Sequence, residues 1–554
     1  MSLIPQEPDP IPEATRRLIE KACPKGTPAT RLRDALGPVY HDEAFADLFP
    51  KRGRPAEAPW RLALVLVLQM MENLTDRQAA QAVCLRLDWK YALSLSPEDE
   101  GFDFSILCDF RERLSSQQAQ ERLLEPIVQV CRANGWLKAG GKQRTDSTHV
   151  LAAVRTLSSI ESVGETLRAS LNELAELDGD WVRSVVTQEW FDRYVHRVEL
   201  ARLPKAETKR AAWVKQLGQD VFYLLAMGQC QQTPTRVRQA ACWSLLSQVW
   251  QQHYEVLEQE VRWRSEPAVS SEERVVSPYD PEARCSRKRE ISWLGFKVHF
   301  TETCEQEEES LHVITQVTTT PATTADALML SPILDDLRQQ DLAPSEHLVD
   351  MGYTSGEELA KQADLGTQVL GPVTAPPGWQ AQQQGGFAPT DFALDWHEQR
   401  ATCPQGQHSL SWKPGQDGNR AVIKIHFATA VCRQCSVRAL CTQSSRGRSL
   451  TILPKSAQEA REHRLAEQAS PAFQQRYARR AGIEATLSVA VRTKGLRRCR
   501  SRGLAKAHLQ HVTIAAAINL ARLDTALQQR ALGKPVRPVR PLSPFARLQE
   551  PVCA

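Results

Sequence analysis

The segment from residue 291 to residue 350 constrains the fold of this 554-residue chain more than any other part of the sequence. Alternating side chains predict a strand at Ile291–Thr303, and a second strand pattern covers Leu311–Thr319. A helical pattern follows at residues 325–339, and a short apolar run then ends at Asp350. The order strand, strand, helix, strand is typical of an α/β layer.

Helical patterns dominate the region before this layer. The stretch Trp60–Met71 is apolar almost all round, which predicts a buried helix. A second helix is predicted after Thr75, whose hydroxyl forms a capping-box pattern with Gln78. With Arg77 on the second helix, the pair suits a DNA-binding helix-turn-helix, and a plain helical hairpin suits the pattern equally well.

These patterns predict an α/β core, an all-helical N-terminal domain, a helical insertion and a small Cys-rich insertion. A further short strand of the core is predicted near residues 143–150. The predicted boundaries are 1–140 for the N-terminal DNA-binding domain, 141–155 for the first strand of the core, 156–278 for the helical insertion, 279–390 for the rest of the core, 391–453 for the Cys-rich insertion, 454–530 for the C-terminal helices and 531–554 for a disordered tail.

Composition narrows the class of protein but not its activity. Hydrophobic residues make up 42% and charged residues 24%, as in ordinary globular proteins. The net charge of +4 neither indicates nor excludes a nucleic-acid enzyme, because local charge decides that. The most apolar stretch, Leu62–Met71, is about half the length of a membrane span. Residues 1–12 are polar and rich in proline, unlike a signal peptide. We therefore expect a cytoplasmic protein whose 14 cysteines are mostly reduced.

Two aspartates occupy strand positions that suit an active site. Asp146 shares one face of its predicted strand with Thr148 and Val150, because side chains alternate along a strand. Asp350 follows an apolar strand, and carboxylates at strand ends are common in α/β active sites. Each aspartate alone is nonspecific, because a single aspartate at a strand end is more often a turn cap than a metal ligand.

A third acid, Glu484, stands alone in a basic segment. Between residues 476 and 506 there are ten basic residues and this single acid. Tyr477, Arg480 and Glu484 recur at helical spacing, so we predict that they line one helical face. The modest interpretation is a surface ion pair between Arg480 and Glu484. The density of positive charge favours a phosphate-backbone footprint, with Glu484 as a metal ligand beside bound DNA.

Four cysteines form a separate cluster. Cys403, Cys432, Cys435 and Cys441 lie in a polar, turn-rich segment, and the middle two have the CxxC spacing. Four thiolates at such spacing predict a structural Zn²⁺ site, with His408 as a substitute ligand. The alternative is four reduced thiols in a small core.

A series of short segments, in order along nearly the whole chain, resembles the insertion-sequence transposases of the 1182 group, relatives of the broader insertion-sequence-4/5 transposases. The segments that carry the resemblance are Gly53–Ala56, Leu74–Ala79, Asp88–Leu93, Gly101–Asp103, Thr145–Val150, Asp280–Arg284, Gly295–His299, Thr301–Cys304, Val349–Tyr353, Gly482–Thr486, Gly503–Lys506 and Leu509–His511.

The resemblance implies an RNase H-like catalytic core interrupted by insertions. Its relatives carry a signature of Tyr, Arg, Glu and Lys at set spacing, which Tyr477, Arg480 and Glu484 match. The Lys position is Val491 here, with basic residues just beyond it. The residues that we expect to contact DNA are Tyr477, Arg480, Arg492, Lys494, Arg497, Arg498, Lys506 and Arg77.

The activity implied is that of a DDE DNA transposase. Asp146, Asp350 and Glu484 would hold two Mg²⁺ or Mn²⁺ ions, about 3.5–4 Å apart, for in-line displacement at phosphorus, with Asp146 nearest the bridging position. The expected partners are the terminal inverted repeats, target DNA and a second copy of the chain, with no membrane. The alternatives are a metal-dependent nuclease without strand transfer and a DNA-binding regulator that keeps the fold without activity.

Overall fold

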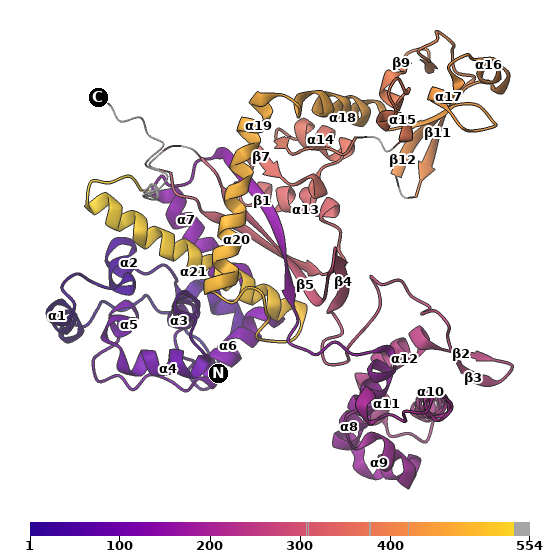
Figure 1. Cartoon of the computed structure of the whole chain (residues 1–554). Helices are drawn as coiled ribbons and strands as arrows, with labels where there is room; N and C mark the ends of the chain where they lie inside the picture. The colour runs from indigo at the N-terminus through magenta and orange to yellow at the C-terminus, as the bar shows by residue number, and fades with distance from the viewer. Residues whose placement is uncertain (306, 308–309, 376–377, 419, 537–554) are drawn as a thin grey trace.

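The computed structural model describes residues 1–305, 307, 310–375, 378–418 and 420–536. Within these residues the protein is a mixed α/β structure, and its largest sheet has the strand order β4-β5-β1-β7-β8, with β6 also paired to β5 (Figure 1). Its strands are β1 (Gly140–Leu151), β4 (Arg284–Lys288), β5 (Ile291–Thr303), β6 (Ile314–Pro321), β7 (Pro344–Val349) and β8 (Gln368–Leu370). The mixed α/β class predicted from the sequence is confirmed.

Strand β1 is the centre of this sheet. It pairs antiparallel with β5, from Gln143 opposite Thr303 to Leu151 opposite Gly295. On its other side it pairs parallel with β7, where Thr145 lies opposite Val349. Strand β5 has the predicted bounds, whereas β6 begins at Ile314 rather than Leu311. The β5–β6 register shifts between Thr301 and Glu302, and beyond the shift the Thr303 hydroxyl donates to the Leu311 carbonyl and accepts from the Val313 N–H, beside a backbone bond from Thr303 to Val313.

Helices cover both faces of the sheet. Helix α20 (Gly482–Thr493) lies across β1 and β5, and α21 (Leu504–Ala531) packs on β6. Helix α13 (Leu330–Gln339), preceded by the 3₁₀ turn η4 (Asp326–Leu328), contacts β6, and α14 (Gly356–Asp364) follows β7 after η5 (Met351–Tyr353). The predicted helix at 325–339 is therefore shorter and begins with a 3₁₀ turn.

The N-terminal region is helical, as predicted. Its elements are α1 (Glu13–Ala22), α2 (Pro28–Leu36), η1 (Asp42–Leu48), α3 (Pro59–Glu72), α4 (Asp76–Leu85), α5 (Leu87–Ala92), α6 (Ser105–Ser116), η2 (Gln120–Leu123) and α7 (Glu125–Ala133). The buried helix α3 and the capping box between Thr75 and Gln78 are confirmed. A short turn with Asn73 in the left-handed conformation separates α3 from α4.

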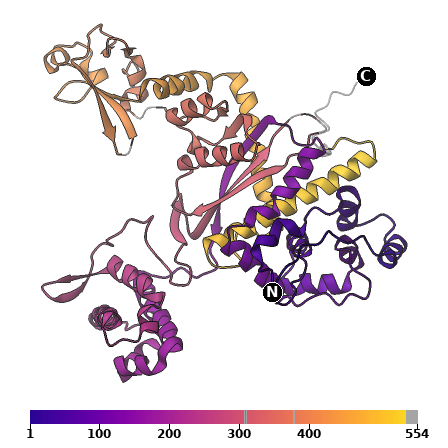
Figure 2. The same cartoon turned by 180° about the vertical axis from the view of Figure 1, so that it is seen from behind.

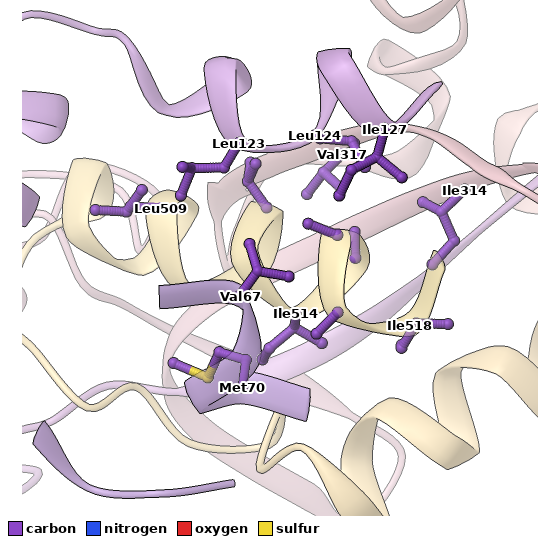
Figure 3. Packing of buried hydrophobic residues seen from close by; sticks show 14 of the residues in the cluster. Val67, Met70, Leu123, Leu124, Ile127, Ile314, Val317, Leu509, Ile514 and Ile518 are labelled. Atoms are coloured by element: carbon purple, nitrogen blue, oxygen red, sulfur yellow. The ribbon is translucent and has the colours of Figure 1, made fainter. Parts of the chain in front are cut away.

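The N-terminal helices and the sheet share one core, with α21 between them. Figure 3 shows Ile514 and Ile518 of α21 among Val67 of α3, Ile127 of α7 and Val317 of β6. These side chains belong to a single continuous cluster of buried apolar residues. Burial of this kind is the main stabilising term in folding, so α21 joins the two regions energetically.

Two insertions have cores of their own. The first follows β1 and consists of α8 (Ser159–Val185), α9 (Gln188–Tyr194), η3 (Leu200–Arg202), α10 (Glu207–Gln229), α11 (Thr235–Arg238), α12 (Cys242–His253), β2 (Tyr254–Leu257) and β3 (Glu260–Trp263). The second consists of α15 (Trp379–Gln382), η6 (Pro389–Asp391), β9 (Ala393–Asp395), β10 (Arg400–Thr402), β11 (Ser411–Asp417), β12 (Arg420–His426), α16 (Thr429–Arg433), α17 (Arg438–Cys441) and β13 (Ser449–Ile452). Figures 1 and 2 show both as lobes on the side away from the N-terminal helices.

The chain returns from the second insertion to the sheet through α18 (Lys455–Glu467), α19 (Pro471–Tyr477) and η7 (Ala478–Ala481), which lead into α20. The helical face predicted from Tyr477, Arg480 and Glu484 is thus divided by a 3₁₀ turn. None of the helices in the described ranges is both long enough and apolar enough to cross a membrane. Most of the tail predicted at 531–554 lies outside the described residues.

Candidate active site

Two of the three predicted acids lie at the same edge of the sheet. Asp146 follows Thr145 on β1, and Asp350 follows Val349 at the end of β7. Because Thr145 and Val349 are partners in the parallel ladder, the two aspartates extend from neighbouring strands. The Asp350 carboxylate is near enough to influence the ionisation of Asp146.

The third acid reaches this edge from helix α20. Glu484 lies in its first turn, four residues after Arg480 of η7. The Arg480 guanidinium donates one hydrogen bond to Oδ2 of Asp146 at 3.0 Å and another to Oε1 of Glu484. The structure thus brings the acids together around one cationic side chain, although they are more than 330 residues apart in sequence.

Burial differs among these groups. The side chains of Arg480 and Asp146 are 15% and 16% exposed, whereas that of Glu484 is 58% exposed. Burial raises the pKa of Asp146, Arg480 opposes the increase, and the charge of Asp350 adds to it. The pKa of Arg480 is lowered by burial but raised more by Asp146, Tyr477 and Glu484, so its net change is upward. The single positive charge of Arg480 therefore does not balance the negative charges of Asp146, Asp350 and Glu484.

Tyr477 completes the cluster. Its ring stacks on Phe473 with centroids 5.5 Å apart, and the Arg480 guanidinium lies 6.0 Å from its centre. Burial raises the pKa of Tyr477, Arg480 opposes this, and the carboxylates of Asp350, Asp146 and Glu484 add to the increase. The predicted face of Tyr477, Arg480 and Glu484 therefore borders both aspartates.

Several of the basic residues predicted to contact DNA have partners within the protein. Lys494 donates to the carbonyl of Met71, and Arg497 donates to Thr148 and to the carbonyl of His149. Lys506 pairs with Glu112 at 2.6 Å.

The remaining predicted basic residues are exposed. The Arg77 guanidinium lies 5.0 Å from the centre of the Phe104 ring. Arg492 and Arg498 are exposed on the segment that follows Glu484. Much of the positive charge counted in the sequence is therefore used to fix this segment in place.

Sequence reasoning missed a buried polar group beneath the acids. It contains Arg144, Glu302, Thr486 and Arg522, which come from β1, β5, α20 and α21. One signal was available: Arg144 is two residues before Asp146 and so shares its strand face. The partners of Arg144 could not be found in this way, because they depend on strand register and on helix packing.

A fourth aspartate lies near this edge. Asp326 of η4 accepts a hydrogen bond from Ser147 Oγ at 3.3 Å and pairs with Lys297 at 3.0 Å. Its charge contributes, with those of Asp146 and Asp350, to the raised pKa of Tyr353. Burial is the largest cause of that increase.

The donor set at this edge suits a hard divalent cation. Carboxylate oxygens are the ligands that Mg²⁺ and Mn²⁺ prefer. Arg480 supplies positive charge to two of these carboxylates, as a cation would. As the side chains of the described residues stand, no three or more His, Cys, Asp or Glu form a group that could hold a metal ion. Arg480 itself bonds the two acids that would face such an ion, so loading requires Arg480 to yield part of this contact.

The four cysteines of the second insertion also converge. All four line one cavity of about 390 Å³, together with Phe387, Phe427 and Arg448. Backbone N–H groups of Gln407 and Arg448 donate to Sγ of Cys403 and of Cys432, both at 3.4 Å. His408 bonds Thr402 through its Nδ1 atom.

Comparison with known proteins adds two matches. A family model described as "Transposase DDE domain" matches residues 402–524, and one described as "Transposase domain (DUF772)" matches residues 17–113. The first contains Glu484 and the four cysteines, whereas Asp146 and Asp350 lie outside it. No curated protein and no solved structure matches the chain. The two matches together indicate a transposase of the DDE type.

Proposed function

We propose that this chain is the DNA transposase of an insertion sequence of the 1182 group, which binds the terminal inverted repeats, cleaves DNA at the element ends and joins the freed 3′-hydroxyl to target DNA. The observation that carries the proposal is the convergence of Asp146, Asp350 and Glu484 at one sheet edge. The two transposase family models add independent support.

The three acids fit the roles that this chemistry requires. When bound, two Mg²⁺ or Mn²⁺ ions would activate the nucleophile and stabilise the leaving oxygen of an in-line displacement at phosphorus. Asp146 neighbours Asp350 through the β1–β7 ladder and shares Arg480 with Glu484, so we assign it to both ions, and Asp350 and Glu484 would each hold one. Without the ions Arg480 bonds both Asp146 and Glu484. With the ions bound to these acids, its guanidinium would be available to a DNA phosphate.

The strand arrangement supports an RNase H-like core. In the order β6-β5-β1-β7-β8, the β6–β5 and β5–β1 pairs are antiparallel and the β1–β7 and β7–β8 pairs are parallel. The edge that carries Asp146 and Asp350 is the carboxyl end of the parallel pair, where α/β proteins commonly place their sites.

The exposed basic side chains are assigned to DNA. Arg492 and Arg498 follow Glu484 and would contact phosphates close to the scissile bond. Arg77, near the start of α4, would contact a groove or backbone if α3 and α4 act as a helix-turn-helix. We propose a cytoplasmic homodimer that brings two element ends together.

A cleavage and strand-transfer assay tests the function. A labelled duplex that carries the element end is incubated with the protein, target plasmid and Mg²⁺. We expect cleaved and joined products from the unmodified chain, and neither product from Asp146→Asn, Asp350→Asn or Glu484→Gln. The control is Glu459→Gln, which changes an exposed acid on α18 and should leave both products intact.

The alternatives give different products. Cleavage without joined DNA would indicate the nuclease. DNA binding without cleavage by the unmodified chain would indicate the regulator. Cleavage that survives all three substitutions at the acids would refute the assignment of these residues.

We further propose that Cys403, Cys432, Cys435 and Cys441 hold a structural Zn²⁺. The convergence of four thiols on one cavity supports this, as do the two N–H···S bonds, because donors to sulfur stabilise thiolate ligands. Metal analysis should find about one Zn²⁺ per chain. Cys432→Ser should lose it and Cys23→Ser, a thiol far from the cavity in sequence, should keep it; retention by both variants would refute the site.

A further inference from the structure

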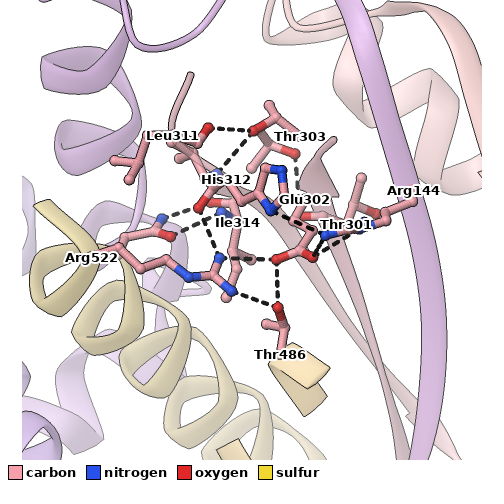
Figure 4. Close-up of polar contacts among 12 residues, drawn as sticks. Arg144, Thr301, Glu302, Thr303, Leu311, His312, Ile314, Thr486 and Arg522 are labelled. Carbon is pink, nitrogen blue, oxygen red and sulfur yellow. Dashed lines mark hydrogen bonds and ion pairs between the residues drawn. The ribbon is translucent and has the colours of Figure 1, made fainter. Parts of the chain in front are cut away.

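A buried charged network lies beneath the three acids. Its centre is Glu302 of β5, whose side chain has no solvent exposure. Oε1 of Glu302 accepts hydrogen bonds from Nε and Nη2 of Arg144 at 2.9 and 2.7 Å. Oε2 accepts from Thr486 Oγ1 at 2.8 Å and from Nη1 of Arg522 at 2.9 Å (Figure 4).

The two oxygens of Glu302 therefore face different parts of the structure. Oε1 binds the strand that carries Asp146, because Arg144 lies directly opposite Glu302 in the β1–β5 ladder. Oε2 binds the helix that carries Glu484, through Thr486, and also binds α21 through Arg522. A second bond from Arg522 to Thr486 closes the link between the two helices. One carboxylate thus connects the elements that hold two of the catalytic acids.

Stability alone does not account for a charged group at this position. Removing charges from water costs free energy, and well-packed apolar residues in place of a buried ion pair are often neutral or stabilising. A hydrogen-bonded charge network instead accepts only one arrangement of its partners.

Arg144 also contacts the start of α20 directly. Its Nη1 donates to the carbonyl of Arg479, which is adjacent to Arg480. The guanidinium lies so close to Gly482 that a Cβ atom there would be 2.1 Å from Nη1 and 2.3 Å from Cζ. Gly482 has ordinary helical dihedral angles, so glycine is required here for close approach and not for a left-handed conformation.

We infer that Glu302, together with Arg144 and Arg522, is a positioning residue that sets the height of helix α20 above strand β1 and so the separation of Glu484 from Asp146. The network consists of residues other than the three acids, and its effect on catalysis would be exerted through Asp146 and Glu484. The catalytic part of this inference rests on the function proposed above.

The first test compares two buried glutamates. Glu302→Gln removes the central charge, and the matched control Glu165→Gln removes a buried glutamate of α8 that binds Arg168 and Tyr279 in the first insertion. The readouts are Mn²⁺ binding, followed by the spectroscopic signal of free Mn²⁺, and hydrogen exchange of the backbone amides of residues 478–493. Asp146→Asn defines the binding that belongs to the catalytic acids.

We expect Glu302→Gln to weaken Mn²⁺ binding about 10- to 100-fold, as loss of a group that orients metal ligands commonly does, and to speed exchange in residues 478–493. Glu165→Gln should speed exchange in α8 and leave Mn²⁺ binding unchanged. If Glu302→Gln left both readouts at the unmodified values, the inference would be overturned. If the unmodified chain showed no Mn²⁺ binding sensitive to Asp146→Asn, the proposed metal site would fail, and exchange in residues 478–493 would still decide whether the network positions α20.

A second test does not disturb the central carboxylate. Gly482→Ala must displace the Arg144 guanidinium or the helix, so we expect weaker Mn²⁺ binding. The control is Gly179→Ala in α8, where an added Cβ meets no atom within 4 Å. Gly482→Ala that bound Mn²⁺ as tightly as the unmodified chain would show that this contact does not position α20.

Discussion

Replacement of Arg480 by Gln should make the stability of the protein depend on divalent metal. The Arg480–Asp146 hydrogen bond is between charged, largely buried side chains and should contribute about 1.5–3 kcal/mol. The bond to Glu484, whose side chain is 58% exposed, should contribute no more than about 1 kcal/mol. Without metal we therefore expect Arg480→Gln to lose about 1.5–4 kcal/mol.

Magnesium should largely reverse this loss. A ligand at about 100 times its dissociation constant stabilises the folded state by about 2.7 kcal/mol. In the unmodified chain the ion must compete with Arg480 for Asp146 and Glu484, whereas in Arg480→Gln both carboxylates are free of that contact. Added Mg²⁺ should therefore raise the unfolding midpoint of Arg480→Gln more than that of the unmodified chain.

Thermal unfolding with EDTA and with excess Mg²⁺ measures the difference. The matched control is Arg476→Gln. Arg476 lies one turn before Arg480, and its substitution breaks a pair with Glu346 of β7. Its loss of stability should be the same in both buffers. Equal losses for Arg480→Gln with and without Mg²⁺ would refute the reasoning, because Arg480 would then stabilise the fold without occupying the metal site.

Three further outcomes are expected. Burial lowers the pKa of His347 and of His511 to about 3, so both side chains stay neutral in the folded chain. In the unfolded chain each histidine has its ordinary pKa of 6.5 and takes up a proton below that pH. Stability should therefore fall as pH falls from 6.5 towards 3, by up to about 1.4 kcal/mol per pH unit for each histidine, and a pH series of unfolding midpoints should show a smaller slope for His347→Gln. Arg492→Ala and Arg498→Ala should each reduce the slope of log affinity for DNA against log salt by about 0.9, measured by fluorescence anisotropy, whereas an unchanged slope would remove that residue from the phosphate contacts. Ile514→Ala, at a fully buried position of α21, should cost about 2–5 kcal/mol and should speed hydrogen exchange in both α3 and β6, because the two pack on the same helix; an effect limited to one of them would contradict a shared core.

The sequence predicted those elements whose signal is local. Strand β5 alternates over its whole length, and helix α3 combines an apolar run with a capping box at the helix that follows it, so both were found. The 3₁₀ turn η7 was missed because its residues continue the helical spacing from Tyr477 to Glu484. The late start of β6 was missed because the β5–β6 register shifts between Thr301 and Glu302, and beyond that shift the Thr303 side chain bonds Leu311 and Val313.

The candidate site was predictable in its acids but not in its supports. An aspartate at a strand end and a single acid in a basic segment are visible in sequence. The partner of Arg144 is not visible, because Glu302 lies 158 residues away and meets it only through the β1–β5 register. Gly482 carries no signal at all, since its requirement comes from the approach of a side chain from another strand.

The basic segment shows why a charge count and a binding surface differ. Arg476, Arg479 and Arg480, which precede Glu484, bond the carboxylates of Glu346 and Asp146 that β7 and β1 present. Lys494, Arg497 and Arg500, which follow it, bond backbone carbonyls of α3, β1 and the turn before α4. Positive charge on this segment thus holds a helix against a sheet that carries acids, a task that apolar contacts alone could not perform without leaving those acids unpaired. A divalent cation would satisfy the same need for positive charge at the acids, so the density of Arg and Lys around Glu484 fits the proposed site as well as it fits the proposed contact with DNA.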